Sequence, residues 1–218
     1  MRERTAEGTS AGLRERKKRR TREALSLAAI RLGIERGWDR VTVEDIAAAA
    51  DVSVRTFGNY FSSKAEAVAA RHLERMLRIA DALRARAADE PLWDAIGSAV
   101  RAQFADGEQA AAGRDEVWRD GLRLMLSEPA LQAEVVKASA AAQGELAQAV
   151  AERTGSDAER DLYPQLVAAV IGAGTAVAVE HCLGAAAPRP LTEVLGEVFA
   201  RVAAGLPEPR RGAVTEGE

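Results

Sequence analysis

Residues 42–64 read TVEDIAAAADVSVRTFGNYFSSK, a stretch with two short predicted helices joined by a tight turn. Each helix begins after a hydroxyl residue, Thr42 or Ser53, of the kind preferred at helix N-caps. Asp45 follows Thr42 by three residues, which predicts a capping box made with the shorter acid. Because the turn at residues 50–52 is so short, it can only make the two helices cross. The stretch therefore predicts a helix-turn-helix.

The second of these helices, predicted over residues 53–60, has one apolar and one polar side. Val54, Phe57 and Phe61 recur at spacings of three and four residues, so we expect all three to face inward. The polar side offers an arginine for guanine or phosphate, an asparagine that matches adenine, and a threonine that can touch a thymine methyl. The residues predicted to face outward are Arg55, Thr56, Asn59 and Tyr60. This side has the chemistry needed to read a DNA groove.

A basic segment lies directly upstream of this unit. Its cations are Arg14, Arg16, Lys17, Lys18, Arg19, Arg20 and Arg22, and Glu15 is the single acid among them. A charge run alone is usually a solvated face, but a basic arm beside a helix-turn-helix is typical of DNA-binding proteins. The residues that we predict to contact DNA are Lys18, Thr42, Ser53, Arg55, Thr56, Asn59, Tyr60 and Lys64, the last two through phosphates.

The two parts of the chain differ in charge. The 218 residues carry a net charge of −3, which by itself argues against a nucleic-acid partner. Residues 1–64 hold 14 Lys and Arg against 9 Asp and Glu, a balance of +5, whereas residues 65–218 hold 16 against 24, a balance of −8. Since a phosphate backbone meets only one face of a protein, the local excess matters more than the sum.

The composition predicts an all-α protein. Hydrophobic residues make up 47% of the chain and aromatic residues only 4%, with Ala and Leu dominant, which favours helix. Gly and Pro breakers divide the sequence into about nine helices. The first is predicted over about residues 13–36, with Leu25, Ala28, Ala29 and Leu32 as a buried stripe and Gly37 as its end. Residues 63–66 predict a second capping box, and the glycines at 107 and 113 predict a loop between them. We expect a disordered arm over residues 1–12, the helix-turn-helix domain over 13–64, a larger helical domain over 65–206 and a flexible tail over 207–218.

Residues 18–64 resemble the DNA-binding domain of TetR/AcrR-type regulators. The matching residues are Gly37-Trp38, Thr42-Val43, Asp45-Ile46-Ala47, Val52-Ser53, Thr56-Phe57, Asn59-Tyr60-Phe61 and Ser63-Lys64. The resemblance implies a homodimer in which three N-terminal helices bind a double-stranded operator and the larger domain binds a small-molecule effector and dimerises. It also implies repression that the effector relieves. In the C-terminal half, LSEPALQAEVV at residues 126–136 and PLTEVLGEVFARV at residues 190–202 loosely resemble mycofactocin-type regulators, which implies a hydrophobic or acyl-type effector.

Two glycines depart from the family pattern. Relatives often have an aromatic residue where this chain has Gly33 in the first helix and Gly58 in the recognition helix. A glycine inside a helix costs roughly 1 kcal/mol relative to alanine. Gly58 therefore predicts either a softer recognition helix or a closer approach of the backbone to DNA.

The effector pocket and the dimer interface are assigned to the C-terminal domain by position. We expect the pocket between the linking helix from Ser63 to Ala88 and the helices around residues 92–181. Its predicted lining residues are Trp93, Phe104, Trp118, Met125 and His181, for each of which ordinary packing is the alternative. The helices predicted over residues 157–183 and 191–206 should form the interface with a second copy.

Other classes of protein fit the sequence poorly. It has no CxxC, HExxH or GxSxG motif and no Gly-rich phosphate loop, so we expect neither an enzyme nor a cofactor or metal site. No stretch approaches the roughly 18 uninterrupted apolar residues of a membrane span. A single cysteine, Cys182, fits a reducing cytoplasm. The alternative that stays open is a helical scaffold or interaction module that has lost DNA binding through Gly58.

Overall fold

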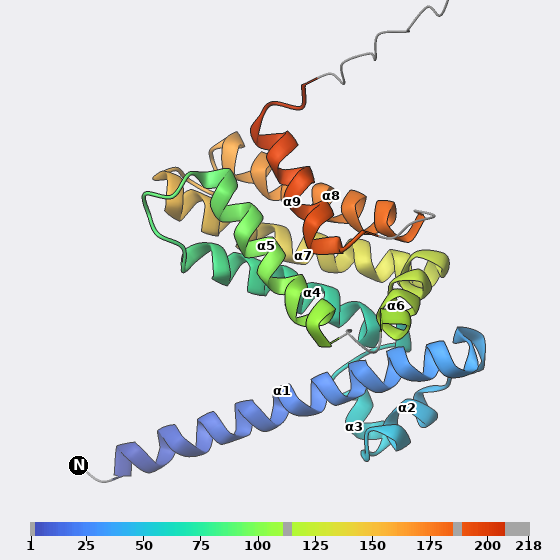
Figure 1. The fold of residues 1–218 in the computed structure, drawn as a ribbon. Helices are drawn as coiled ribbons and strands as arrows, with labels where there is room; N and C mark the ends of the chain where they lie inside the picture. The colour runs from blue at the N-terminus through green and yellow to red at the C-terminus, as the bar shows by residue number, and fades with distance from the viewer. Residues whose placement is uncertain (1–2, 111–114, 185–188, 208–218) are drawn as a thin grey trace, which may run out of the picture.

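The computed structural model describes the backbone of residues 3–110, 115–184 and 189–207, and the side chains within these ranges except at 3–13, 106–110 and 115–118. This part of the chain is helical, with no strand, which confirms the predicted all-α class. The elements are α1 (Glu3–Arg36), η1 (Trp38–Arg40), α2 (Val43–Ala49), α3 (Val54–Gly58), α4 (Lys64–Arg84), α5 (Leu92–Ala110), α6 (Asp115–Ser127), α7 (Pro129–Thr154), α8 (Leu162–Gly184) and α9 (Leu191–Ala203). Helices α1–α3 form a small module below a bundle of the later helices, and α4 joins the two (Figure 1).

The N-terminal module has its own hydrophobic core. The predicted stripe of α1 is buried, with Leu25 and Ala29 fully enclosed. Phe57 and Phe61 lie beside it with their ring centroids 5.8 Å apart. Trp38 closes the core just after Gly37, whose φ of 83° ends α1 as predicted.

Val54 does not belong to this core, which corrects the predicted inward row. Its side chain is 45% exposed, whereas Phe57 is 2% exposed. Val54 is the first residue of α3, and Val52 in the preceding turn packs against the core instead. Val52 of the turn therefore occupies the core position that helical spacing predicted for Val54.

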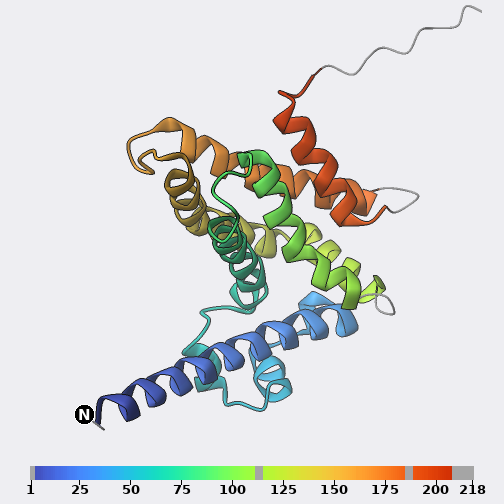
Figure 2. The ribbon, with the colours of Figure 1, turned by 60° about the vertical axis from the view of Figure 1, so that its left-hand side comes forward.

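Helix α1 begins at Glu3, well before the predicted helix start at Leu13. No proline interrupts residues 3–12, which is compatible with a helix there. The disorder expected for residues 1–12 stays a prediction. The N-terminal turns of α1 extend beyond the rest of the molecule in both views (Figures 1 and 2).

Helix α4 contributes to both cores. Ala65, Ala67 and Val68 pack in the N-terminal core, whereas Met76, Ile79 and Leu83 belong to the larger core made with α5, α7, α8 and α9. The two cores therefore divide within α4 rather than at its start, and α4 runs through both of them.

Several helix ends differ from the predicted ones. Helix α4 ends at Arg84 rather than near Ala88, and α9 ends at Ala203 rather than Leu206. Helix α5 continues past Asp106-Gly107, where the predicted loop to Gly113 begins, and reaches Ala110, because one glycine weakens a helix without ending it. Helix α8 begins only at Leu162, since the Asp157 carboxylate accepts bonds from the amides of residues 159 and 160 and forms a separate turn. The predicted flexible tail from residue 208 onward lies outside the described residues.

Helix α8 keeps a large apolar surface in the single chain. Within the described ranges it is the one helix long and apolar enough to cross a membrane by length and composition, a test that core helices also pass. Its exposed apolar residues are Leu162, Tyr163, Leu166 and Val177, and Leu162 is 76% exposed. This face is thus unpaired in one copy of the chain.

Candidate DNA-binding surface and effector domain

Thr42 opens α2 with the predicted capping box. The Asp45 amide donates to Thr42 Oγ1 at 3.2 Å, and Asp45 Oδ2 accepts from the Thr42 amide at 3.0 Å. The Thr42 hydroxyl also donates to Asp45 Oδ2 at 2.8 Å. Bonds from the Thr42 amide and hydroxyl, together with the nearby Arg36 guanidinium, hold the pKa of Asp45 below its usual value. The hydroxyl proton of Thr42, a residue that we predict to contact DNA, is therefore engaged in the cap.

Ser53 opens α3 in a similar way. The Thr56 amide donates to Ser53 Oγ at 3.0 Å, and the two hydroxyl oxygens lie 2.8 Å apart. Arg55 and Asn59, the two residues predicted to read bases, are both exposed. Their exposure leaves both side chains accessible for contact with another molecule.

Helix α3 ends at Gly58, whereas the sequence predicted that it would reach Tyr60. Glycine is a poor helix former, and the amide of Asn59 donates to the carbonyls of both Arg55 and Thr56, which marks a tightening last turn. A Cβ atom on Gly58 would meet nothing within 4 Å. The protein's own packing therefore does not require a glycine at this position.

Lys64 is turned into the N-terminal module. Its Nζ donates to the carbonyl oxygens of Trp38 at 2.7 Å and Val41 at 2.9 Å, and it lies 4.4 Å from the centroid of the Trp38 ring. An ammonium group has three donors, so at most one remains for the predicted phosphate contact. We correct the main role of Lys64 to that of a brace between α4 and η1.

The second predicted capping box is shifted by one residue. Ser63 caps α4 by accepting from the Glu66 amide at 3.0 Å. The Glu66 carboxylate, however, accepts from the amide and hydroxyl of Ser62, each at 2.7 Å, and not from Ser63. The helix start is therefore held by two serines instead of one.

The basic segment forms an exposed part of α1. Residues 14–20, Lys18 among them, are all exposed. Arg22, the last cation of the segment, turns inward: its guanidinium lies 4.6 Å over the Phe61 ring and 3.7 Å from Glu74. Its Nη1 also donates to the carbonyl of Tyr60, whose half-buried ring packs on the N-terminal core. Arg22 therefore ties α1 to α4, while the preceding cations lie on the exposed surface of α1.

The predicted pocket residues do not converge. Trp93 and Phe104 pack with the C-terminal core, Met125 packs on the N-terminal core, and His181 is exposed on α8. The side chain of Trp118 lies outside the described residues. The structure therefore does not bring the described members of this set together at one site.

Helix α4 also carries a polar cluster, His72 and Arg75, that the sequence did not predict. His72 Nε2 lies 2.8 Å from Ser139 Oγ of α7, and burial together with the charge of Arg75 lowers the pKa of His72 to about 4. The Arg75 guanidinium carbon lies 4.5 Å from the centroid of Phe104 on α5, and burial lowers the pKa of Arg75 to about 10. The available signal was that His72 and Arg75 each precede a buried apolar residue, Met76 or Ile79, by four positions, the spacing of a buried helix face.

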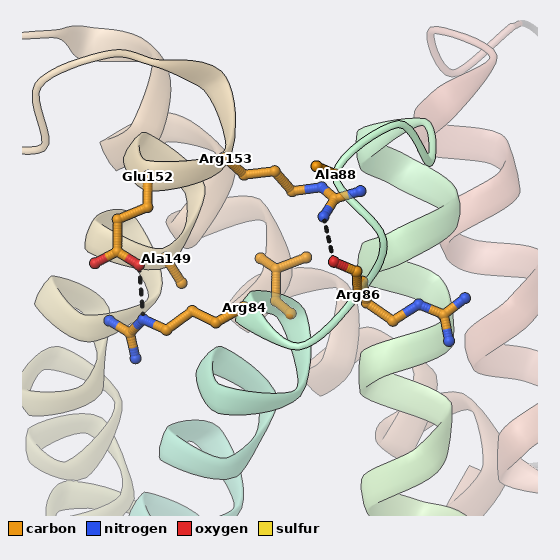
Figure 3. A pocket seen from close by; sticks show the side chains of 7 residues that line it. Arg84, Arg86, Ala88, Ala149, Glu152 and Arg153 are labelled. Carbon is orange, nitrogen blue, oxygen red and sulfur yellow. Dashed lines mark hydrogen bonds and ion pairs between the residues drawn. The ribbon is translucent and has the colours of Figure 1, made fainter.

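A cavity of about 190 Å³ lies where α4 ends against α7 (Figure 3). Arg84 Nε donates to Glu152 at 3.1 Å, and Arg153 donates to the carbonyls of Arg86, Ala87 and Glu90. Arg84 thus joins the end of α4 to α7, and Arg153 holds the loop after α4. These hydrogen bonds stabilise the fold. The cavity is smaller than the roughly 300–1,000 Å³ of ordinary ligand sites.

Comparison with known proteins decides between a regulator and other helical proteins. Residues 27–70 match the family described as bacterial regulatory proteins, tetR family, and residues 90–207 match the MftR C-terminal domain. The chain is 36% identical over 166 residues to the HTH-type transcriptional regulator TcmR of Streptomyces glaucescens, covering 74% of this chain and 73% of that protein. The chain belongs to the TetR family.

Other relatives agree with this assignment. The putative mycofactocin biosynthesis transcriptional regulator MftR of Mycobacterium tuberculosis is 32% identical over 195 residues, covering 88% of this chain and 93% of that one. The structure of Thermus thermophilus FadR, a TetR-family repressor in complex with lauroyl-CoA, aligns with a TM-score of 0.51 at 20% identity, over 88% of this chain and 98% of that one. FadR of Bacillus halodurans aligns with a TM-score of 0.52 at 19% identity, over 87% and 97% of the two chains. These structural likenesses show a shared fold.

The two cores correspond to the two family segments that match this chain. The N-terminal core carries the family's helix-turn-helix, and the relatives are transcriptional regulators rather than enzymes. The larger core falls within the segment that matches the MftR C-terminal domain, apart from the second half of α4. The chain is thus a DNA-binding regulator of the TetR family with an MftR-type C-terminal domain.

Proposed function

We propose that this TetR-family chain is a repressor that a small-molecule effector releases from a pseudo-palindromic operator. The observation that carries the proposal is the exposure of Arg55 on the capped helix α3 and of Asn59 directly after it, together with the exposed cations of α1. Arginine pairs with guanine and asparagine with adenine through two hydrogen bonds each, which is the usual direct readout of the major groove. Lys18, Thr56 and Tyr60 would add contacts at the groove wall.

Two copies of the chain would act together. The exposed apolar residues of α8, Leu162, Leu166 and Val177, are a surface that a second copy would cover. Helix α9 packs against α8 and would complete a four-helix interface, as family members act as dimers. The two α3 helices would then enter successive major grooves of half-sites about 34–36 Å apart.

Two elements would carry the effector signal to α3. Helix α4 has its first half in the N-terminal core and its second half in the C-terminal core. Helix α6 packs against α1, where Gly121 lies beside Ile30 and Ile34. An effector that favours one placement of α4 and α6 would shift the population between DNA-competent and incompetent dimers. We expect a hydrophobic or acyl-type effector and a cytoplasmic location.

A gel shift with the DNA upstream of the chain's own coding sequence, repeated across salt concentrations, tests the proposal. A regulator that neutralises phosphates should bind and should weaken steeply as salt rises. A scaffold that has lost DNA binding would give no shift at any salt.

Genes neighbouring the coding sequence would then narrow the chemical class of the effector. An exporter indicates a drug-like compound, whereas lipid or redox genes indicate an acyl-type one.

A further inference from the structure

Arg75 differs from the other described arginines of α4. Arg71 lies 3.7 Å from Glu74, and Arg78 donates to Gln103 at 3.2 Å. Arg75 Nε is buried and has no hydrogen-bond partner, and among the side chains that the structure describes no carboxylate pairs with its guanidinium. Arg75 as a whole is half-buried, but an enclosed Nε donor without a partner on a cation without a counter-charge is costly in a folded protein.

The surroundings of Arg75 are positive. Arg71 and Arg78 lie four residues before and three residues after it, so all three share one face of α4. Burial is the main cause that lowers the pKa of Arg75 to about 10, and the charges of Arg71 and Arg78 lower it further. Arg75 is still charged at pH 7, since this pKa lies above 7. His72, by contrast, is neutral at pH 7 and is bonded to Ser139.

The acid nearest in sequence does not neutralise this face. Glu74 Oε1 lies 3.7 Å from Arg22 Nε of α1, and its Oε2 lies 3.7 Å from Arg71 Nη1. Gln103, the partner of Arg78 from α5, is uncharged. The described groups packed around Arg75 therefore leave an excess of positive charge between α4 and α5.

Phe104 orients the unpaired guanidinium. The Arg75 Cζ lies 4.5 Å from the ring centroid, a distance at which a cation is attracted to an aromatic face. Phe104 is itself buried and fixed in the C-terminal core. Stacking on a ring occupies the face of a guanidinium and leaves its N–H donors, which lie in the plane, for an acceptor.

We propose that Arg75 anchors a single anionic group, carboxylate or phosphate, of an organic effector whose apolar part lies against Phe104. The planar fork of arginine donors matches the paired oxygens of either group. The proposal rests on the proposed function in that it names the chemistry of the effector. Since Arg75 lies on the helix that Lys64 braces to the N-terminal module, an anion held here would act on the element joining the two cores.

Calorimetric titration of the full chain, without DNA, tests the anchor with three probes that each contain eight carbons: octanoate, octyl phosphate and 1-octanol. We expect at least one anion to bind roughly tenfold or more tightly than 1-octanol, as expected for a charged hydrogen bond. Arg75→Gln should remove this advantage. Arg78→Gln is the matched control, because Arg78 is exposed and has a neutral partner, and it should change the affinity by less than about threefold.

Three results would overturn the anchor: neither anion binds, 1-octanol binds as tightly as both anions, or Arg75→Gln binds like the unaltered chain. A preference between octanoate and octyl phosphate identifies which group the site takes. The comparison with 1-octanol uses the unaltered chain, so it decides the matter even if Arg75→Gln does not fold. A chain that binds its operator but shows no anion preference refutes only the anchor, whereas Arg75-dependent anion binding without operator binding refutes only the proposed repressor.

Discussion

Gly33 of α1 lies directly against Leu124 of α6: a Cβ atom on Gly33 would be 2.7 Å from Leu124 Cδ2. On the facing helix, a Cβ atom on Gly121 would be 3.4 Å from Ile30 Cγ2. Glycines on both helices therefore allow α1 and α6 to approach closely. This contact accounts for Gly33, where the family pattern often has an aromatic residue, and it joins the C-terminal domain to the DNA-binding module.

Replacing Gly33 by leucine should separate α1 from α6. The added side chain has no room beside Leu124, and overpacking of this kind costs about 1–3 kcal/mol. Urea unfolding should show this loss, and operator binding should respond less to an effector. Gly58→Ala is the control, because a Cβ atom there meets nothing within 4 Å, and it should leave stability unchanged or higher. Unchanged stability of Gly33→Leu would show that the contact is unimportant.

Arg55→Ala should weaken operator binding by about 1–3 kcal/mol and relax the base preference at one position of each half-site. Fluorescence anisotropy with a set of single-base operator variants measures both effects. Arg160→Ala is a suitable control, because Arg160 is an exposed arginine in the turn before α8. Equal weakening on every operator variant would move Arg55 from base readout to a phosphate contact.

Lys64→Met should lower the free energy of unfolding by about 1–3 kcal/mol, because the carbonyls of Trp38 and Val41 lose a charged donor. Methionine keeps an apolar stem over the Trp38 ring. The salt dependence of operator binding should stay the same. If Lys64 instead acts mainly on phosphate, the salt slope would fall by about one unit while stability would hardly change.

His72 should make the protein less stable in mild acid. Its pKa falls from 6.5 to about 4 on folding, so the unfolded chain takes up a proton where the folded chain does not. Stability is therefore lost as the pH falls from 6.5 through 4, by up to about 3 kcal/mol. His72→Gln keeps a partner for Ser139 and should lose less stability over this window in urea titrations. Identical pH profiles for the two chains would contradict the buried, neutral histidine.

Local features of the fold were predictable from the sequence. The caps at Thr42 and Ser53 depend on residues three positions apart, and the Leu25–Leu32 stripe depends on helical spacing, so both follow from short-range chemistry. The prediction that Val54 faces the core was wrong, because Val52 in the turn before it packs against the core instead. That choice depends on how α2 and α3 cross, which spacing alone does not specify.

The candidate sites were harder to predict because they depend on tertiary contacts. Lys64 bonds to carbonyls 26 and 23 residues away, which no local pattern indicates. The Arg75–Phe104 contact joins α4 to α5, and neither the size of a side chain nor its place along the chain indicates which side chains meet in space. Aromatic and methionine side chains in a helical bundle are mostly core, so size was a weak guide.

The most direct test of the central claim is the stoichiometry and affinity of the full chain on its operator, measured by anisotropy on an intact site and on one with a scrambled half-site. We predict two chains on the intact site, a steep fall in affinity as salt rises, and a loss of affinity when either half is scrambled. Equal affinity for intact and scrambled DNA, or a single chain bound, would contradict the account.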